Sequence, residues 1–222
     1  MPPTLQHLEQ FAESVGWIAL SSSLKGCNHR SVSGPIRSVA IHRITDASDS
    51  TGPACTDTVS LFEIIHQLMG ARVISTSSSD EKLERLTALG ADHTINYKTT
   101  PAWGAKVQEL TNGIGVDHVI EVGGPGTLPE SIDAVRIGGH IALIGTLTGR
   151  TGDVPTSKFM AKQARLQGLI VGSRAHQQEM IRAIEANDIH PVVDRSFTLE
   201  EIADAFRYEE SGKHFGKICL EF

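Results

Sequence analysis

Three consecutive serines, Ser77, Ser78 and Ser79, and the nearby Lys82 form the most informative chemical pattern in the sequence. They follow a β-branched run and precede a helical pattern, so they stand where a strand turns into a helix. At this place in a dinucleotide-binding sheet, an acidic residue commonly binds the ribose hydroxyls. Here no carboxylate occurs before Asp80, and hydroxyl donors with a cation suit a 2′-phosphate. Alternatively, the serines cap the helix and Lys82 is a solvated surface cation.

Residues for metal or nucleophilic chemistry do not form a recognisable pattern. The cysteines Cys27, Cys55 and Cys219 lie far apart, and Cys27 with His29 supplies only two of the about three ligands that a catalytic zinc needs. We therefore expect no zinc site and no disulfide scaffold. No Ser/His/Asp or Cys/His constellation is present, and residues 212–217 lack the pattern of a phosphate-binding loop. The catalytic residues are unknown at this point.

The apolar periodicity predicts an α/β fold with a doubly wound parallel sheet. Short β-branched runs alternate with helical patterns, and the runs are almost continuously apolar, as expected for strands covered on both faces. The expected strands are residues 72–76, 93–96, 117–122, 140–145 and 168–172. The expected helices are residues 59–70, 80–89, 107–111, 128–135 and 177–186, the last with Met180, Ile181 and Ile184 facing inward.

Both ends of the chain depart from this alternation. In the front segment, residues 38–44 fit a strand, whereas residues 21–35 and 46–57 are polar and favour loops or disorder. After Pro191, residues 199–208 predict a helix, with Thr198 as N-cap and Glu201 completing a capping box. Residues 215–222 predict a final strand. We expect this helix and strand to complete no further crossover and to pack elsewhere.

Composition and charge exclude several classes of protein. The 222 residues are 40% hydrophobic and 21% charged, which is typical of a globular chain. The net charge of −6 argues against nucleic acid or an anionic membrane as the main partner. No apolar stretch approaches the roughly 20 residues of a membrane span, and the N-terminus does not resemble a signal peptide. With few, scattered cysteines, we expect a cytoplasmic location.

From Gly70 onward, the sequence resembles the coenzyme-binding domain of the medium-chain dehydrogenase/reductase superfamily, in particular its zinc-type alcohol dehydrogenase-like and quinone oxidoreductase branches. The stretches that carry the resemblance are GARVISTSSSDEKLERLTALGADHTINYK, GIGVDHVIEVGGPGT, IGGHIALIGTLTG, GLIVGSR and SGKHFGKICLEF. With residues 59–69, they cover the chain to its end almost without gaps. The resemblance implies a Rossmann-like sheet and hydride transfer between a nicotinamide dinucleotide and a small-molecule alcohol, carbonyl, quinone or enone.

The resemblance also implies which residues contact the coenzyme. Lys82 and Tyr97 would contact a 2′-phosphate, so that NADP(H) is expected rather than NAD(H). Lys217 would reach a phosphate, unless it is simply a charged surface residue. Strand ends would line the nicotinamide, although each aliphatic residue alone fits the core equally well; they are Val122, Gly123, Ile144, Gly145, Thr146, Leu169, Ile170 and Val171.

Two departures from the family pattern concern the front of the chain. Family members begin with a GroES-like catalytic domain, and nothing in residues 1–54 resembles one. In GPACTDTVS, Asp57 and Thr58 stand where the family has glycines, so that a side chain and a negative charge meet the pyrophosphate. We therefore expect weak coenzyme binding. The expected parts are an atypical, partly disordered segment (1–57), a Rossmann-like domain (58–195) and a tail (196–222).

Three functions fit these observations. The first is an NADP(H)-dependent oxidoreductase, here truncated; the second is a non-catalytic nucleotide-binding or interaction module; the third is a mis-spliced relic without activity. The resemblance also implies a homodimer, formed through the strand around residues 144–147. An uncovered apolar face of the tail would favour association as well, and it contains Ile202, Ala205, Phe206 and Ile218.

Overall fold

The computed structural model describes residues 38–42, 70–170 and 172–222. The expected helix at residues 59–70, the polar stretches 21–35 and 46–57 with Asp57, and Val171 lie outside these residues, apart from Gly70. The chain divides into two compact units, one with residues 36–166 and 191–222 and a smaller one that includes residues 167–190.

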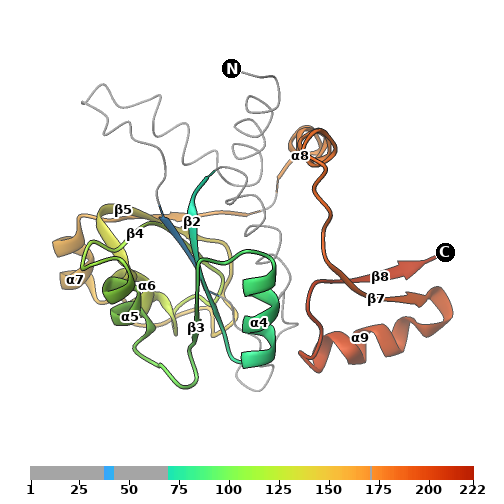
Figure 1. Ribbon diagram of the computed structural model, residues 1–222, viewed down its shortest axis with the longest axis horizontal. Coiled ribbons are helices and arrows are strands. Elements are labelled where there is room, and N and C mark those ends of the chain that lie inside the picture. Colours follow the sequence, from blue (N-terminus) through green and yellow to red (C-terminus); the bar gives the residue numbers. More distant parts are fainter. Residues whose placement is uncertain (1–37, 43–69, 171) are drawn as a thin grey trace. The chain divides into compact units, whose positions relative to one another are not determined.

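A six-stranded sheet forms the centre of the larger unit (Figure 1). Its strands are β1 (Ser38–His42), β2 (Arg72–Ser77), β3 (His93–Asn96), β4 (Val116–Glu121), β5 (Val135–Leu143) and β6 (Arg165–Gly168). The order is β3-β2-β1-β4-β5-β6, and the pairs β2–β3, β1–β2, β1–β4 and β4–β5 are parallel. This order is that of the doubly wound Rossmann sheet, which confirms the expected fold class.

The front segment contributes the central strand of this sheet. β1 pairs with β2 on one side and with β4 on the other, so that Ala40 is opposite both Ile74 and Val119. The strand expected at residues 38–44 is confirmed over Ser38–His42. The Rossmann-like domain was expected to comprise residues 58–195, but its sheet also includes this strand from residues 1–57. The strand order reverses between β1 and β4, where sheets of this kind bind ligands beyond the carboxyl ends of the strands.

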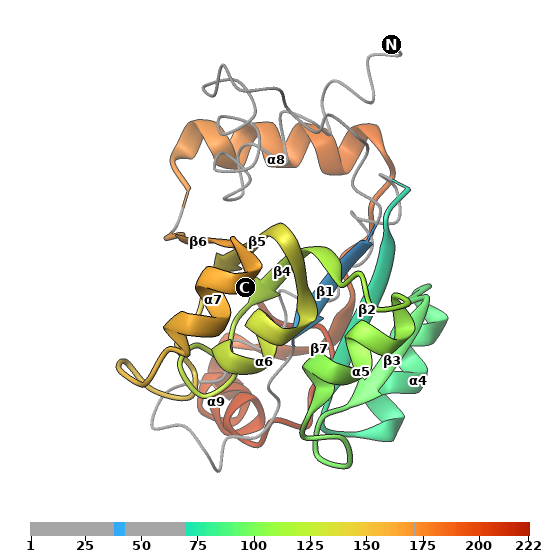
Figure 2. The ribbon, with the colours of Figure 1, turned by 90° about the vertical axis from the view of Figure 1, so that its left-hand side faces the viewer.

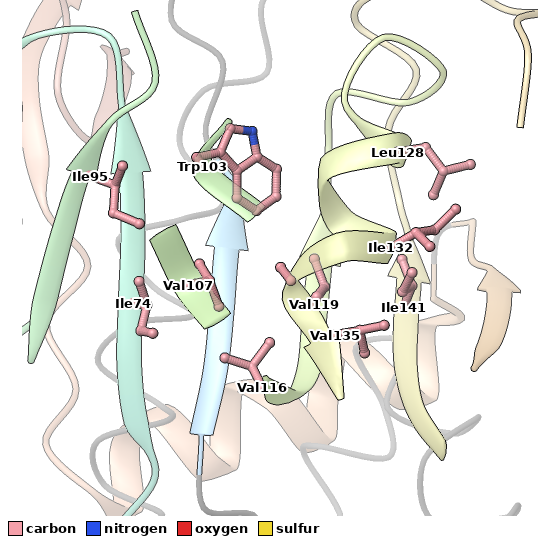
Figure 3. Packing of buried hydrophobic residues seen from close by; sticks show 11 residues of the cluster. Ile74, Ile95, Trp103, Val107, Val116, Val119, Leu128, Ile132, Val135 and Ile141 are labelled. Carbon is pink, nitrogen blue, oxygen red and sulfur yellow. The ribbon is translucent and has the colours of Figure 1, made fainter. Parts of the chain in front are cut away.

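Helices α5 (Trp103–Leu110) and α6 (Leu128–Ala134) lie side by side over one face of the sheet (Figure 2). Their apolar side chains pack with those of β2, β3, β4 and β5 (Figure 3). Trp103 is only 2% exposed and Val107 is fully buried, so the expected helical residues 107–111 belong to a longer buried helix. This core fixes the strands whose carboxyl ends form the candidate site. The cluster contains Ile74, Ile95, Trp103, Val107, Val116, Val119, Leu128, Ile132, Val135 and Ile141.

Two strand boundaries differ from the expectation. β5 begins at Val135 rather than at residue 140, directly after α6, because Val135 is fully buried and pairs with Val116. The strand expected at residues 168–172 is wrong, since β6 ends at Gly168. Leu169 and Ile170 follow that strand, and Ile170 is 92% exposed. A short apolar run does not by itself distinguish a buried strand from an exposed connection.

The tail forms a small second sheet, so the expectation that it completes no crossover is wrong. β7 (Val193–Thr198) and β8 (Lys217–Glu221) pair in parallel, and the turn η3 (Leu199–Glu201) and α9 (Ile202–Glu210) connect them. β7 was not expected because its sequence, VDRSFT, has no apolar run. The tail was expected to begin at residue 196, but β7 continues across this boundary from Val193 to Thr198.

The end of β7 carries the expected capping box. The backbone N–H of Thr198 donates to Glu201 Oε2 at 2.9 Å, which confirms this motif. On α9, Ile202 is 38% and Phe206 63% exposed, whereas Ala205 is buried and Ile218 on β8 half-buried. The apolar face expected to be uncovered is therefore smaller than the sequence indicates, and the homodimer stays a prediction.

The described part of the smaller unit is dominated by α8 (Arg174–Ala186). Ser173 is its N-cap, and a capping box joins Ser173 and His176. Ala183 is fully buried, whereas Ile181 is 44% exposed, so the inward orientation expected for Ile181 is wrong. Met180 and Ile184, the other two residues expected to face inward, are half-buried. No helix in the described ranges is both long and apolar enough to span a bilayer.

Candidate functional site

The carboxyl end of β2 brings the serine cluster next to the end of β3. Ser77 is the last residue of β2, and its carbonyl accepts a hydrogen bond from the backbone N–H of Tyr97 at 3.1 Å. Ser78 follows, half-buried, and Ser79 is the N-cap of α4 (Asp80–Ala88). The Ser79 side chain makes no capping hydrogen bond, so the alternative role of the serines as helix caps does not hold for Ser79.

The Ser77 side chain is completely buried. Among the described residues, its Oγ has no hydrogen-bond partner. A buried polar group in this state costs about 1–3 kcal/mol, so it calls for a reason such as a partner supplied by a ligand. The first carboxylate after the strand is already engaged, because Asn96 Nδ2 donates to Asp80 Oδ1 at 2.6 Å. The end of β2 therefore presents hydroxyl groups without a free carboxylate beside them.

Lys82 lies on α4 and faces the tail rather than solvent. Lys82 is only 8% exposed, and its Nζ donates a hydrogen bond to the carbonyl of Gly212 at 2.5 Å. The alternative interpretation of Lys82 as a solvated surface cation is therefore wrong. Arg85, one turn later, lies 4.0 Å above the ring of Phe215 and places Nη1 3.4 Å from Asp194 Oδ1. The tail is thus attached to the helix that follows the serine cluster.

The loops that follow β4 and β5 interlock at the same edge of the sheet. The Glu121 carbonyl accepts hydrogen bonds from Ile144 N at 2.9 Å and from Gly145 N at 3.3 Å. Thr148 donates to the Gly123 carbonyl through both its backbone N–H and its Oγ1, each at 2.8 Å. These bonds bring together five of the expected site residues. Val122 and Gly123 are buried, Ile144 and Gly145 are half-buried, and Thr146 is exposed.

A buried carboxylate organises the turn between β4 and α6. Glu121 Oε1 accepts hydrogen bonds from Gly123 N at 2.6 Å, Gly124 N at 2.9 Å and Thr127 Oγ1 at 2.7 Å. Oε2 accepts one from Ser131 Oγ at 2.5 Å. Burial raises the pKa of Glu121 above its ordinary value, although these hydrogen bonds act in the opposite direction. Because four donors occupy the carboxylate, Glu121 positions the turn and is not placed to exchange protons with a substrate.

Sequence analysis missed this role of Glu121. A usable signal was present, since a carboxylate ends an apolar strand and two glycines follow it directly. Glycine N–H groups at such a turn lack strand partners and can reach back to the side chain.

The other expected residues lie elsewhere along the chain. Leu169 is half-buried and Ile170 exposed, and both belong to the smaller unit. Lys217 is exposed at the start of β8, where its backbone N–H donates to the Val192 carbonyl at 2.7 Å. In residues 70–170 and 172–222, no three His, Cys, Asp or Glu side chains are grouped to hold a metal ion.

Two histidines pack against each other on β4 and β5. The rings of His118 and His140 meet edge to face, with centroids 5.7 Å apart. His140 is only 4% exposed, and burial, aided by the positive charge of Arg165, lowers its pKa to about 4. His140 is therefore a neutral core residue at physiological pH.

His140 is expected to make the fold less stable in mild acid. Its pKa is about 4 in the folded state and ordinarily 6.5, so the unfolded chain takes up a proton first as the pH falls. The stability is complete above the ordinary value and is lost progressively toward the folded value, by at most about 3 kcal/mol and less with solvent screening. Urea unfolding between about pH 7 and 5 measures this loss.

The control for this prediction is His140→Leu. Its pH dependence should be weaker than that of the original chain over the same range. Comparing the two chains also removes the contribution of Glu121, whose raised pKa acts in the opposite direction. Equal pH dependence in both chains would contradict the assignment.

Comparison with known proteins agrees with this architecture. The zinc-binding dehydrogenase family matches residues 64–186, more than half of the chain. A zinc-type alcohol dehydrogenase-like protein of Schizosaccharomyces pombe is 44% identical over 171 residues, which cover 75% of this chain and 49% of that protein. The chain spans about half the length of the curated relatives it matches.

Solved structures show the same arrangement. A crystal structure from Sinorhizobium meliloti, provisionally described as an alcohol dehydrogenase, has a TM-score of 0.76 and 31% identity, and the match covers 95% of this chain and 56% of that one. The structure of an NAD-dependent alcohol dehydrogenase has a TM-score of 0.75 and 28% identity, covering 100% and 57%. With its strand order and the family match over most of the sheet, the chain belongs to the zinc-binding dehydrogenase family within the medium-chain dehydrogenase/reductase superfamily.

Proposed function

We propose that the protein is an NADP(H)-dependent oxidoreductase that transfers a hydride between the dinucleotide and an alcohol, carbonyl, quinone or enone. The observation that carries this proposal is the end of β2 in a Rossmann sheet. A carboxylate at this place would bind the ribose of NAD(H). The chain has instead the buried hydroxyl of Ser77, which has no hydrogen-bond partner within the described part of the chain. Relatives that are alcohol dehydrogenase-like support the reaction type.

The residues at the end of β2 fit the 2′-phosphate end of the dinucleotide. Ser77 Oγ lacks a partner in residues 38–42, 70–170 and 172–222, and the Ser79 side chain makes no capping hydrogen bond. The backbone of Tyr97 holds this residue beside them. The first carboxylate after the strand, that of Asp80, already accepts a hydrogen bond from Asn96 Nδ2. Lys82 Nζ already donates one hydrogen bond to the Gly212 carbonyl, so a phosphate bound here would share this ammonium group with the tail.

The interlocked loops after β4 and β5 fit the nicotinamide end. The bound dinucleotide supplies the hydride, and the chain holds the ring in place and excludes water. A Cβ atom on Gly124 would lie 2.8 Å from Thr146 Cα, and one on Gly145 would lie 2.2 Å from the Val122 carbonyl oxygen. The glycines therefore let backbone pack on backbone, which makes this wall of the site rigid.

Replacing Ser77 with alanine tests the coenzyme assignment. Because Ser77 Oγ has no partner among the described residues, Ser77→Ala should leave the stability of the free protein unchanged or raise it. The same change should weaken NADPH binding by about three- to tenfold, the value of one hydrogen bond. Calorimetric titration with NADPH and urea unfolding measure the two effects.

Ser157→Ala is the matched control, because Ser157 is an exposed serine on α7 (Thr156–Lys162). It should change neither quantity. Loss of stability in Ser77→Ala with unchanged NADPH affinity would show that the hydroxyl has a structural role and would contradict the assignment.

Turnover separates the two remaining candidate functions. NADPH oxidation is followed by absorbance in the presence of a quinone, an enone or an aldehyde. An oxidoreductase consumes NADPH with at least one of them. Binding of NADPH without oxidation by any of the three contradicts the proposed activity and supports the alternative, a dinucleotide-binding module. NADH is titrated in parallel, since one solved structure similar to this chain is described as NAD-dependent.

A further inference from the structure

A hollow of about 530 Å³ lies at the edge of the sheet opposite to the candidate coenzyme site. It is called here the amino-edge pocket, because part of its lining precedes β4 or stands at the start of β5, while the rest comes from α6 and α7. Ile114 precedes β4, while Arg136 and Ile137 are among the first residues of β5. The volume falls within the range of small-molecule sites. The side chains that matter are Ile114, Asp133, Arg136, Ile137, Lys158 and Lys162.

The charge of the amino-edge pocket is opposite to that of the whole chain. Three cationic side chains and one carboxylate line it, in a protein whose net charge is −6. The carboxylate is occupied, because Lys158 Nζ lies 3.0 Å and 2.8 Å from the two oxygens of Asp133. Arg136 likewise forms an ion pair with Asp117 at 2.6 Å, so the positive charge that these ion pairs leave unbalanced in this lining is that of Lys162.

Two of the cations keep unused hydrogen-bond donors. Lys162 Nζ donates to the carbonyls of Asp133 at 3.0 Å and Val135 at 2.7 Å, and these are two of its three N–H groups. Arg136 donates from Nε to Asp117 Oδ1 at 2.6 Å and from Nη1 to the Ile137 carbonyl at 2.8 Å. The third N–H of Lys162 and the Nη2 group of Arg136 make no hydrogen bond to any described residue. Both cations are fixed in place and able to bind an anion.

The same pocket exposes aliphatic surface. Ile114 is 67% exposed and Ile137 64% exposed, although isoleucine is among the residues most often buried. A purely inorganic anion would leave these side chains in water, whereas a ligand with an apolar part would cover them. The pocket thus combines cationic and aliphatic groups.

We propose that the amino-edge pocket binds a small amphipathic anion, with the anionic head at its cations and an aliphatic tail against its two isoleucines. Both a carboxylate and a phosphate monoester satisfy the chemistry of the head. The site lies at the amino ends of β4 and β5, whereas the proposed coenzyme residues follow the carboxyl ends of β2, β4 and β5. Binding at the two sites is therefore not competitive.

The test uses the full chain with decanoate and decyl phosphate as probes, followed by calorimetry and by NMR of labelled isoleucine methyl groups. Both probes should bind saturably and shift the signals of Ile114 and Ile137, with no competition from NADPH. Decanol, which has no anionic head, and acetate, which has no tail, should bind at least about tenfold more weakly. A decanol affinity equal to that of decanoate would overturn the proposal, and so would displacement of decanoate by NADPH.

Variants locate the ligand. Lys158→Gln and Ile137→Ser should each weaken decanoate binding by about fivefold or more. Lys106→Gln is the matched control, because Lys106 forms an ion pair of the same 2.8 Å length with Glu109 outside the pocket. It should have no effect on decanoate binding. Absence of saturable binding to the original chain, or equal effects of Lys158→Gln and Lys106→Gln, would refute the proposed site.

Discussion

Replacing Glu121 with alanine is expected to lower the free energy of unfolding by about 3 to 4 kcal/mol. The change removes the acceptor of the N–H groups of Gly123 and Gly124 and of the Ser131 hydroxyl, and leaves the Thr127 hydroxyl only the Gly124 carbonyl at 3.2 Å. It also leaves a cavity where the residue is fully buried. Urea unfolding followed by circular dichroism measures the loss.

Glu121→Gln and Glu109→Ala are the controls for this prediction. Glutamine keeps one oxygen for the two glycines and Thr127 and offers an amide donor to Ser131, so it should cost less than half as much as alanine. Glu109 is an exposed partner of Lys106, and its removal should change the stability by about 0.5 kcal/mol or less. If Glu121→Ala is as mild as Glu109→Ala, the carboxylate does not organise the turn.

Gly145→Ala is expected to lower the free energy of unfolding by about 3 kcal/mol and to weaken dinucleotide binding. A Cβ atom at this position would lie 2.2 Å from the Val122 carbonyl oxygen, closer than any contact between these atoms allows. The obstacle is backbone rather than a flexible side chain, so the β4 and β5 loops must separate. Thermal unfolding and NADPH titration measure the two effects.

Gly168→Ala is the matched control, because a Cβ atom there meets nothing within 4 Å. We expect it to be neutral or slightly stabilising, as alanine restricts the unfolded chain. An equally small effect at Gly145 would show that the two loops are not interlocked.

The sequence predicts β2 and β3 well because their signal is local. β3 (HTIN) occurs at the expected residues, and β2 (RVISTS) extends only one residue further, since both contain β-branched residues and alternate with a recognisable helix. β7 could not be expected in the same way. Its residues are mostly exposed, and it is a strand because it pairs with β8, which follows much later in the chain.

The candidate site could be predicted only in part for a similar reason. Ser77 and Tyr97 each follow a recognisable strand, so their shared edge of the sheet can be inferred from the topology. The hydrogen bond between Lys82 and Gly212 joins residues 130 positions apart, and no local pattern predicts it. Glu121 was recognisable as a residue at a strand end, but its four donors depend on how the following turn closes around it.

The central claim is that the edge formed by β2 and β3 accepts the 2′-phosphate of NADP(H), and parallel calorimetric titrations of the unmodified chain with NADPH and NADH test it most directly. With Ser77 in place of a carboxylate and Asp80 held by Asn96, NADPH should bind at least about tenfold more tightly than NADH. Equal or tighter binding of NADH, or no measurable binding of NADPH, would contradict the account.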